Sequence, residues 1–199
     1  MKKYISVSIG LNRSEFNKAA KLYWQAFSGK LNFFLGPKKK GEMYISKIIN
    51  NKNVFVARDK DNHIVGLSGF RDKNGGVIGG SHDDLVAVYG YFGALWRFQF
   101  MKLLAREDSF NFLHLDAVCV EENSRCKGVG KKLISFAKEL AKAKSLKGID
   151  LDVISSNGSA ITFYRKLNFY KISEAKIGRI GLMGYFLGYK SIIRMRLDL

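Results

Sequence analysis

The segment "RCKGVGKK", residues 125–132, places four basic side chains around two glycines that are separated by one residue. An amphipathic run follows directly, so the segment should lead into the start of a helix. Glycine lets the backbone approach a ligand closely and adopt positive φ. The first turn of a helix offers unpaired N–H groups and the positive end of its dipole. Together these features predict a phosphate site.

Positive charge is concentrated in the same region. From Arg125 to Lys147 the chain has eight basic residues and one acidic residue, Glu139. The whole chain carries 34 Lys and Arg against 17 Asp and Glu, which gives a formal net charge of +17. This balance favours anionic partners, namely nucleotides, nucleic acid or an anionic membrane surface.

The pattern of the loop narrows the choice of phosphate ligand. The Walker pattern GxxxxGK[ST] is absent, and GxGxxG fails because position 133 is Leu. What remains is Arg125-x-x-Gly128-x-Gly130 after a predicted strand. This resembles the acetyl-CoA loop of the GCN5-related N-acetyltransferase (GNAT) superfamily, whose pattern is Gln/Arg-x-x-Gly-x-Gly/Ala.

A second segment, "NGSAITFYRKLNF" at residues 157–169, resembles another signature of that superfamily. The signature is an Asn at a strand end, a short helix with Phe-Tyr, and a Gly-Phe or Asn-Phe pair. The family most often has Gly before the last Phe, where this chain has Asn168, and both residues tolerate a left-handed helix cap. The clear resemblance covers about residues 110–170, and looser similarity extends over the chain except residues 72–109. The matching residues are Asn157, Ala160, Phe163, Tyr164, Leu167 and Phe169.

The resemblance implies acetyl-CoA as co-substrate. Its pantetheine arm would pair with main-chain groups of Val118 and Val120 as if it were an added strand. N–H groups between Cys126 and Lys131 would hold the pyrophosphate. The residues implied in binding are Val118, Cys119, Val120, Arg125, Cys126, Lys127, Gly128, Val129, Gly130, Lys131, Asn157 and Tyr164.

Acetyl transfer to an amine needs a base for the amine proton, a donor for the oxyanion and an acid for the departing thiolate. Tyr164 is the candidate acid, and the backbone N–H of Val120 could supply the oxyanion donor. Strict alternation along "HLDAVCV" puts His114, Asp116, Val118 and Val120 on one face, which makes His114 and Asp116 candidates for the base. An ordinary structural role for both stays open, and a bulge would change the facing.

The elements that must position these residues follow from periodicity. Strands are predicted at 4–10, 53–59, 63–71, 110–120, 148–155, 169–176 and 191–199. Helices are predicted from an N-cap at Ser14, after Pro37, over 83–104, from Val129 to about 145, and over 159–167. We therefore expect one α/β (α+β) domain over residues 1–199. The resemblance implies the GNAT-like acyl-CoA N-acyltransferase fold, in which helices flank a central mixed, mostly antiparallel, twisted sheet, here with a helical insert near residues 81–105.

The insert has six aromatic residues between glycine-rich ends. It could wall the acceptor pocket, thicken the core, or lie on a membrane surface, although its polar face is poor for the last role. The glycine- and aromatic-rich residues 177–190 are a second candidate for framing the acceptor pocket.

Other classes of protein are less consistent with the sequence. The N-terminus lacks the apolar core of a secretory signal, and the longest apolar stretch, residues 85–96, is far below the roughly 18 residues of a membrane span. Two cysteines favour a reducing, cytoplasmic location, and no metal-ligand spacing occurs. We expect a primary amine on a small molecule or peptide as acceptor, with acidic residues such as Asp83-Asp84 or Glu121-Glu122 near it if it is cationic. A homodimer is possible. The alternatives are a nucleic-acid-binding module, which no recognition motif supports, and a CoA-binding regulator without catalysis.

Overall fold

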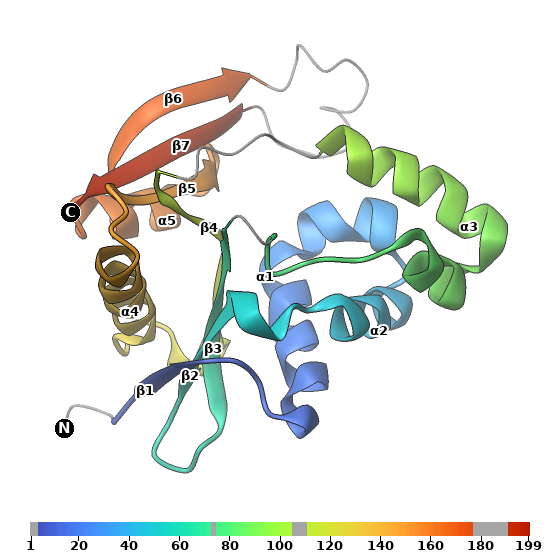
Figure 1. Cartoon of the computed structure of the whole chain (residues 1–199), viewed down its shortest axis with the longest axis horizontal. Coiled ribbons are helices and arrows are strands. Elements are labelled where there is room, and N and C mark those ends of the chain that lie inside the picture. Colours follow the sequence, from blue (N-terminus) through green and yellow to red (C-terminus); the bar gives the residue numbers. More distant parts are fainter. Residues whose placement is uncertain (1–3, 73–74, 105–110, 177–190) are drawn as a thin grey trace.

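The computed structural model describes residues 4–72, 75–104, 111–176 and 191–199. Its strands form one sheet in the order β1-β2-β3-β4-β5-β7-β6 (Figure 1). The strands are β1 (Ser6–Ile9), β2 (Val54–Arg58), β3 (Ile64–Arg71), β4 (Leu113–Val120), β5 (Gly148–Ile154), β6 (Tyr170–Lys176) and β7 (Ser191–Asp198). The helices are α1 (Phe16–Leu35), α2 (Lys38–Ile48), α3 (His82–Leu104), α4 (Val129–Ala143) and α5 (Gly158–Arg165). This order and the mostly antiparallel sheet confirm the predicted fold class.

Two hydrophobic cores cover the two faces of the sheet. One core joins α1, α2 and α3 to the sheet through residues such as Trp24 and Tyr44. The other joins α4 and α5 to it through residues such as Leu133 and Tyr164. Figure 1 shows α4 and α3 on opposite sides of the molecule, with the sheet between them. The predicted helical spacing from Val129 holds, because Val129, Leu133 and Ala137 are all buried.

The first helix begins differently from the prediction. The predicted N-cap Ser14 lies within a 3-10 turn, Arg13–Glu15, that precedes α1. Asn12 occupies the cap position instead, and its backbone N–H donates to Glu15 Oε2 at 2.6 Å. Both Asn12 and Ser14 have side chains suited to a cap, so sequence alone did not separate them.

Strand β4 contains a bulge at Asp116, which overturns the predicted shared face. Gly69 of β3 pairs with Ala117 and Phe70 pairs with Leu115, so Asp116 has no partner in the ladder. Strict alternation therefore fails at this residue. Val118 lies on the α4 face together with Leu115, whereas His114 lies on the opposite face.

Among the strands that the structure describes, β4 and β5 are the one parallel pair, and they separate part of the way along. The pairing runs from Leu113 with Ile149 to Leu115 with Leu151 and then stops. Both strands continue, to Val120 and Ile154, without pairing to each other. We call the space between these two unpaired strand ends the gap, and β4 leads from it through residues 121–128 into α4.

The predicted helical insert is α3, interrupted at Gly90, where φ is 71° and ψ is 170°. Leu85 and Ala94 on either side of the interruption are buried in the core that contains α1 and α2. In the described part of the chain, no helix has the length and apolarity needed to cross a membrane. The predicted pocket-framing segment, residues 177–190, lies outside the described residues.

Candidate active site

The loop before α4 has the backbone geometry of an anion site. Gly128 is the N-cap with φ 83° and ψ 0°, and Cys126 is also left-handed with φ 57°. The N-cap Gly128 makes no side-chain hydrogen bond to the N–H groups in the first turn of α4. An added Cβ at Gly128 would meet no atom within 4 Å, so glycine is needed there for its φ and not for space. Exposed Lys127 donates to Asn123 O at 2.5 Å and holds the loop.

Glycine is required at Gly130, the second glycine of the loop, for a different reason. A Cβ at Gly130 would lie 3.0 Å from Cζ of Phe163, which is tighter than an ordinary carbon contact. The absence of a side chain at Gly130 therefore lets α5 approach the first turn of α4. The two segments that the sequence singled out separately are in direct contact through these residues.

Main-chain groups of β4 face the gap between β4 and β5. The N–H of Glu121 bonds to Val65 O of β3 at 2.9 Å. Because an antiparallel ladder alternates, the intervening groups of Val118 and Val120 point away from β3. Arg125 Nε reaches Val120 O at 3.4 Å, which places this predicted residue at the mouth of the gap. The side chain of Cys119 is 1% exposed in the opposite core, and its main chain is paired with Leu67 of β3, so neither its side chain nor its main chain faces the gap.

Tyr164 lies on the α4 face and is 8% exposed. Its ring packs against Phe163 and Phe169, with centroids 5.2 and 5.5 Å away. Burial raises the pKa of the Tyr164 phenol, and the nearby Cys119 thiol raises it further. Nothing in the described part of the chain accepts or donates a hydrogen bond at its hydroxyl. Tyr164 is therefore a buried residue with a neutral hydroxyl that is able to donate a proton.

Asn157 is placed at the end of β5, as the sequence indicated, and caps α5. Its Oδ1 accepts from the N–H of Ala160 at 3.1 Å and from Ser159 Oγ at 3.0 Å. These bonds use the carbonyl oxygen of the exposed side chain and leave its amide N–H groups for a ligand.

His114 is held by a residue that the sequence analysis did not select. Its Nδ1 lies 2.8 Å from Asp150 Oδ1 of β5, whereas its Nε2 is 4.0 Å from Asp116. Asp150 in turn is 3.5 Å from Arg196 of β7. Asp116 is paired with Arg71 at 3.0 Å. The structure therefore brings His114 and Asp116 near each other, but Asp150 orients the imidazole.

Burial and charge act in opposite directions on His114, which is 8% exposed. Burial lowers the pKa of its imidazole, but the hydrogen bond to Asp150 and the charges of Asp150, Asp116 and Asp152 outweigh this effect and raise the pKa. The pairing of β4 with β5 creates the arrangement. No local pattern in the sequence identifies Asp150, because it is 36 residues away from its partner.

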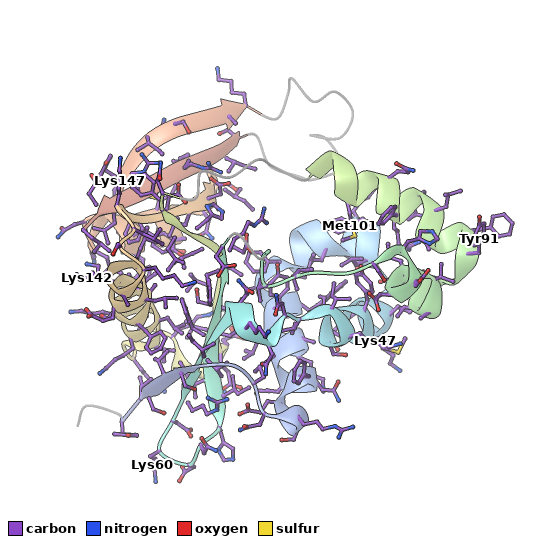
Figure 2. The ribbon with its side chains drawn as sticks, viewed as in Figure 1. Lys47, Lys60, Tyr91, Met101, Lys142 and Lys147 are labelled. Carbon is purple, nitrogen blue, oxygen red and sulfur yellow. The ribbon has the colours of Figure 1, made fainter. Side chains whose placement is uncertain are left out.

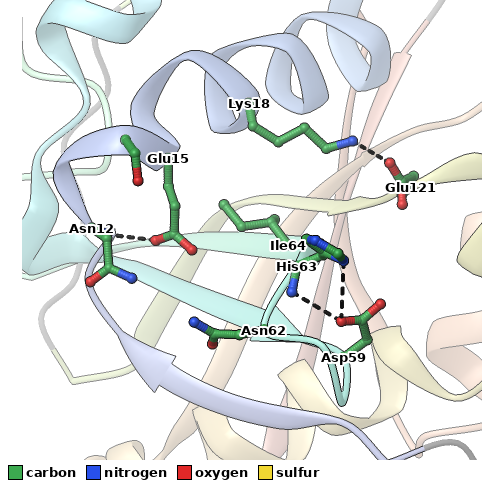
Figure 3. Close-up of a pocket in the computed structure, with 9 residues that line it drawn as sticks. Asn12, Glu15, Lys18, Asp59, Asn62, His63, Ile64 and Glu121 are labelled. Carbon is green, nitrogen blue, oxygen red and sulfur yellow. Dashed lines mark hydrogen bonds and ion pairs between the residues drawn. The ribbon is translucent and has the colours of Figure 1, made fainter.

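A separate hollow of about 580 Å³ lies between the start of α1, the β2–β3 hairpin and the end of β4 (Figure 3). Its lining includes Asn12, Ser14, Glu15, Lys18, Asp59, Asn62, His63, Ile64 and Glu121. Two of its carboxylates are already paired, Glu15 with Arg58 and Glu121 with Lys18. The hollow therefore contains Glu121, one of the acidic residues that the sequence suggested for a cationic acceptor, but with its charge balanced.

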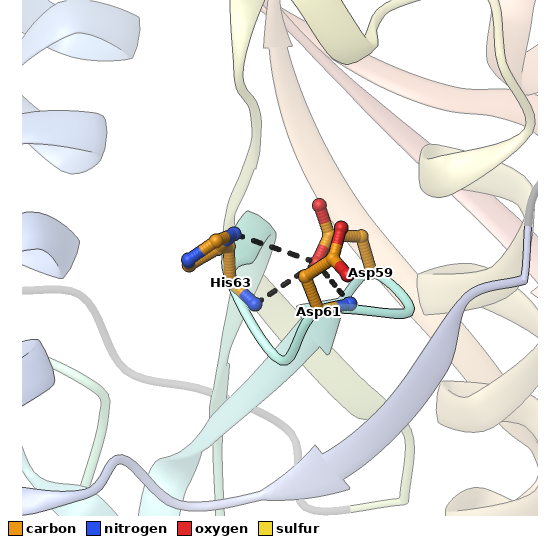
Figure 4. A group of neighbouring side chains, drawn as sticks. All are labelled: Asp59, Asp61 and His63. Atoms are coloured by element: carbon orange, nitrogen blue, oxygen red, sulfur yellow. Dashed lines mark hydrogen bonds and ion pairs between the residues drawn. The ribbon is translucent and has the colours of Figure 1, made fainter.

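Three groups at the tip of the β2–β3 hairpin also lie together (Figure 4). Ligand-type atoms of Asp59, Asp61 and His63 are all within 4.8 Å of one another. Asp59 Oδ1 accepts from the backbone N–H groups of Asp61 and His63 at 3.0 and 2.9 Å. The geometry is that of an Asp-stabilised turn, which explains the cluster.

Comparisons with known proteins agree with this geometry. The model of the acetyltransferase (GNAT) family matches residues 16–169. No curated protein sequence matches the chain. Among solved structures, a GCN5-related N-acetyltransferase from Kribbella flavida is 14% identical with a TM-score of 0.64, and 98% of each chain is covered. The ribosomal-protein-S18-alanine N-acetyltransferase from Escherichia coli is 13% identical with a TM-score of 0.57, covering 98% of this chain and 94% of that one.

A third similar structure contains a ligand. It is a Bacillus anthracis acetyltransferase in complex with acetyl coenzyme A, 20% identical with a TM-score of 0.50. The match covers 77% of this chain and 66% of that one, slightly under two thirds of its length. At these identities the solved structures establish the fold, and the family model establishes the relationship.

Proposed function

The chain belongs to the acetyltransferase (GNAT) family, and from that premise we propose that it transfers the acetyl group of acetyl-CoA to a primary amine by direct attack in a ternary complex. One observation carries the proposal. The pairing of β4 with β5 stops before both strands end, and the unpaired end of β4 leads through the left-handed Gly128 loop into α4, while the unpaired end of β5 leads through Asn157 into α5, which carries Tyr164.

The residues around the gap suit acetyl-CoA. N–H groups of the loop, from Cys126 to Lys131, would hold the pyrophosphate, with Arg125 and Lys127 adding positive charge. Main-chain groups of Val118 and Val120 would pair with the pantetheine arm, and the free amide of Asn157 would donate to it. Acetyl-CoA bound there supplies an activated acetyl group whose thioester carbonyl an amine can attack.

His114 would accept the proton of the amine. Asp150 accepts a hydrogen bond from Nδ1–H in the neutral imidazole, which leaves the lone pair on Nε2 available. Nε2 lies 4.0 Å from Asp116 Oδ1, too far for a direct hydrogen bond. The proton of the amine would therefore reach Nε2 directly or through a water. Asp150 is a positioning residue in this scheme, since it acts through His114.

Two further groups complete the chemistry. The N–H of Val120 points into the gap and would stabilise the oxyanion. The Tyr164 hydroxyl would protonate the departing thiolate, and its raised pKa keeps it protonated at neutral pH. The acid and the base lie on opposite faces of the sheet, which fits a thioester that lies in the gap and an amine that arrives from the His114 side.

The His114 side also has charges that would contact an acceptor. Asp152 of β5 pairs with Arg194 of β7 at 3.0 Å, next to the pair formed by Asp150 and Arg196. Acidic residues do gather locally, but at different positions from those suggested by the sequence, and each has a basic partner. This mixture of acidic and basic side chains suits an acceptor that carries both a cationic amine and polar or anionic groups.

The test is to incubate the protein with acetyl-CoA and a panel of amines. Turnover is measured as release of free CoA thiol, and mass spectrometry identifies the acetylated acceptor. The wild type should acetylate at least one primary amine, and Tyr164→Phe should lose most of that activity while still binding acetyl-CoA. Tyr44→Phe, at a buried tyrosine on the opposite face, is the matched control. Acetyl-CoA binding with every amine left intact would instead indicate a CoA-binding regulator. Salt-sensitive RNA binding without acetyl-CoA binding would favour the nucleic-acid alternative.

A further inference from the structure

A stripe of large apolar side chains is exposed on the second segment of α3. We call these residues the α3 stripe; they are Tyr91, Phe92, Leu95 and Trp96, with 64, 86, 49 and 43% of their surface exposed. Their spacing places them on one side of a helix, so they form a continuous surface. Contiguous exposed apolar surface of this kind marks a contact site.

The side of α3 opposite the stripe is packed against the core, which explains why the sequence of α3 contains few polar residues. Ala94 is buried, and Phe98 and Met101 pack against the core shared with α1 and α2. The positions that a free amphipathic helix would fill with charged residues are therefore in contact with protein. Polar groups for an interfacial role must come from neighbouring elements, and the shortage within α3 is no obstacle to such a role.

The neighbouring helix α2 supplies these charges. Lys38, Lys39 and Lys40 are exposed at its start. Lys40 Nζ lies 5.9 Å from the centre of the Tyr89 ring, which is two residues before the stripe, across the interruption at Gly90. The Arg97 guanidinium stacks on the ring of Trp96 at 4.3 Å. Figure 2 shows Tyr91 at the outer edge of the molecule, with Lys47 of α2 on the same side.

Carboxylates near the stripe are fewer than the cations. Glu42 lies 3.8 Å from Lys38, and Asp83 and Asp84 are at the start of α3. Lys40 and Arg97 contact rings of α3, and α2 carries three further basic side chains, Lys38, Lys39 and Lys47, so the basic residues of α2 and Arg97 outnumber these three acidic ones. The whole chain adds a net charge of +17.

We propose that the α3 stripe and the lysines at the start of α2 dock on an anionic lipid surface. Tyr, Trp, Phe and Leu suit the boundary between headgroups and acyl chains, and Lys and Arg bind anionic headgroups. A second copy of the chain fits less well, because an isologous contact would bring the same basic residues against each other. Nucleic acid fits less well, because bases stack on aromatic rings along a basic groove, whereas Phe92 protrudes and Leu95 has no ring.

Trp96 provides a local probe, because the other tryptophan, Trp24, is 3% exposed in the core. We would titrate the full chain with vesicles of phosphatidylcholine alone, and with vesicles of phosphatidylcholine and phosphatidylglycerol in equal parts. The expected result is a blue shift of Trp96 emission and co-sedimentation with the anionic vesicles only. Trp96→Phe should abolish the shift but not the co-sedimentation.

Two variants and two matched controls make the test specific. Phe92→Ser removes the most exposed ring and should weaken partition into anionic vesicles about tenfold or more. Lys39→Glu should weaken it roughly tenfold through charge. Tyr4→Ser and Lys60→Glu make the same kinds of change at exposed residues away from the stripe, and should change partition less than about twofold. Lys60 lies far from Tyr91 in Figure 2, and β1, which begins two residues after Tyr4, lies on the other side of the molecule from α3 in Figure 1.

Several results would overturn the proposal. One is a wild type that binds neither kind of vesicle. Another is equal weakening by the variants and their controls, which would indicate nonspecific attraction by the net charge. A third is a concentration-dependent dimer that Phe92→Ser abolishes, without vesicle binding, which would make a second copy the occupant. Amine acetylation does not enter this test, so the two proposals stand or fall separately.

Discussion

The contact between Gly130 and Phe163 connects the two segments that identify the family, and it can be tested by substitution. In Gly130→Ala the new methyl group would be 3.0 Å from Cζ and 3.6 Å from two other ring carbons of Phe163. Optimal carbon contacts are about 3.5–4.0 Å. Either the ring moves by a few tenths of an ångström or the first turn of α4 shifts. Tyr164 follows Phe163 directly, so either movement reaches the proposed acid.

The size of the effect follows from two opposing contributions. Overpacking a well-packed contact costs about 1–3 kcal/mol. Replacing Gly by Ala in a helix gains up to about 1 kcal/mol, and less in the first turn. We therefore expect Gly130→Ala to destabilise the protein by about 1 kcal/mol, which for a chain of this length lowers Tm by roughly 2–4 °C. In a Phe163→Leu background the ring edge is absent, so the same substitution should be neutral or stabilising.

The assay is a double-mutant cycle in urea unfolding, with the wild type, both single variants and the double variant. A coupling energy of about 1–2 kcal/mol between the two positions is the expected result. Calorimetric measurement of acetyl-CoA binding by the same four proteins shows whether the steric contact with Phe163 alone is changed or the ligand site is also lost. Additive unfolding energies, with no coupling, would refute the contact and assign Gly130 to the ligand alone.

Four further predictions concern the proposed catalytic groups and one buried ion pair. Tyr164→Phe should lower kcat about 100-fold or more with acetyl-CoA affinity and Tm unchanged, measured by steady-state kinetics, calorimetry and thermal unfolding. A neutral His114 is the base, and Asp150 raises its pKa, so Asp150→Asn should move the acid limb of the kcat/KM profile to lower pH; an unmoved limb would exclude His114. The pair of Arg58 with Glu15 is almost buried, and Arg58→Ala should cost about 3 kcal/mol in urea unfolding. The hydrogen bond that Glu15 accepts from Arg58 lowers the pKa of the Glu15 carboxyl. The wild type should therefore be more stable than Glu15→Gln at pH values above the ordinary Glu pKa, and this difference in unfolding free energy should shrink as the pH falls through the lowered pKa.

The fold was largely predictable because its elements are regular. Alternation marked the strands, and spacing such as Val129, Leu133 and Ala137 marked the helices. The Arg-x-x-Gly-x-Gly loop lies at the start of α4, with Gly128 in the left-handed conformation that glycine favours. Local rules succeed where each residue depends on near neighbours in the chain.

The remaining features depend on contacts between distant segments. A single bulged residue, Asp116, reversed the facing of the residues before it, and no period-two pattern reveals such a bulge. Asp150 became the partner of His114 through the parallel pairing of β4 and β5. The sequence also did not reveal which side of α3 is exposed. Phe92 is exposed and Ala94 is buried, but both are apolar residues in the same apolar run.

The most direct test of acetyl-CoA binding at the Gly128 loop is calorimetry on the wild type, Gly128→Asp and Gly75→Asp. Both glycines have positive φ and open space around a Cβ, but only Gly128 lies at the start of α4. We predict that the wild type and Gly75→Asp bind acetyl-CoA and that Gly128→Asp binds at least about tenfold more weakly, with its fold intact by circular dichroism. A folded wild type that does not bind acetyl-CoA, or a Gly128→Asp variant that binds as tightly as the wild type, would contradict the account.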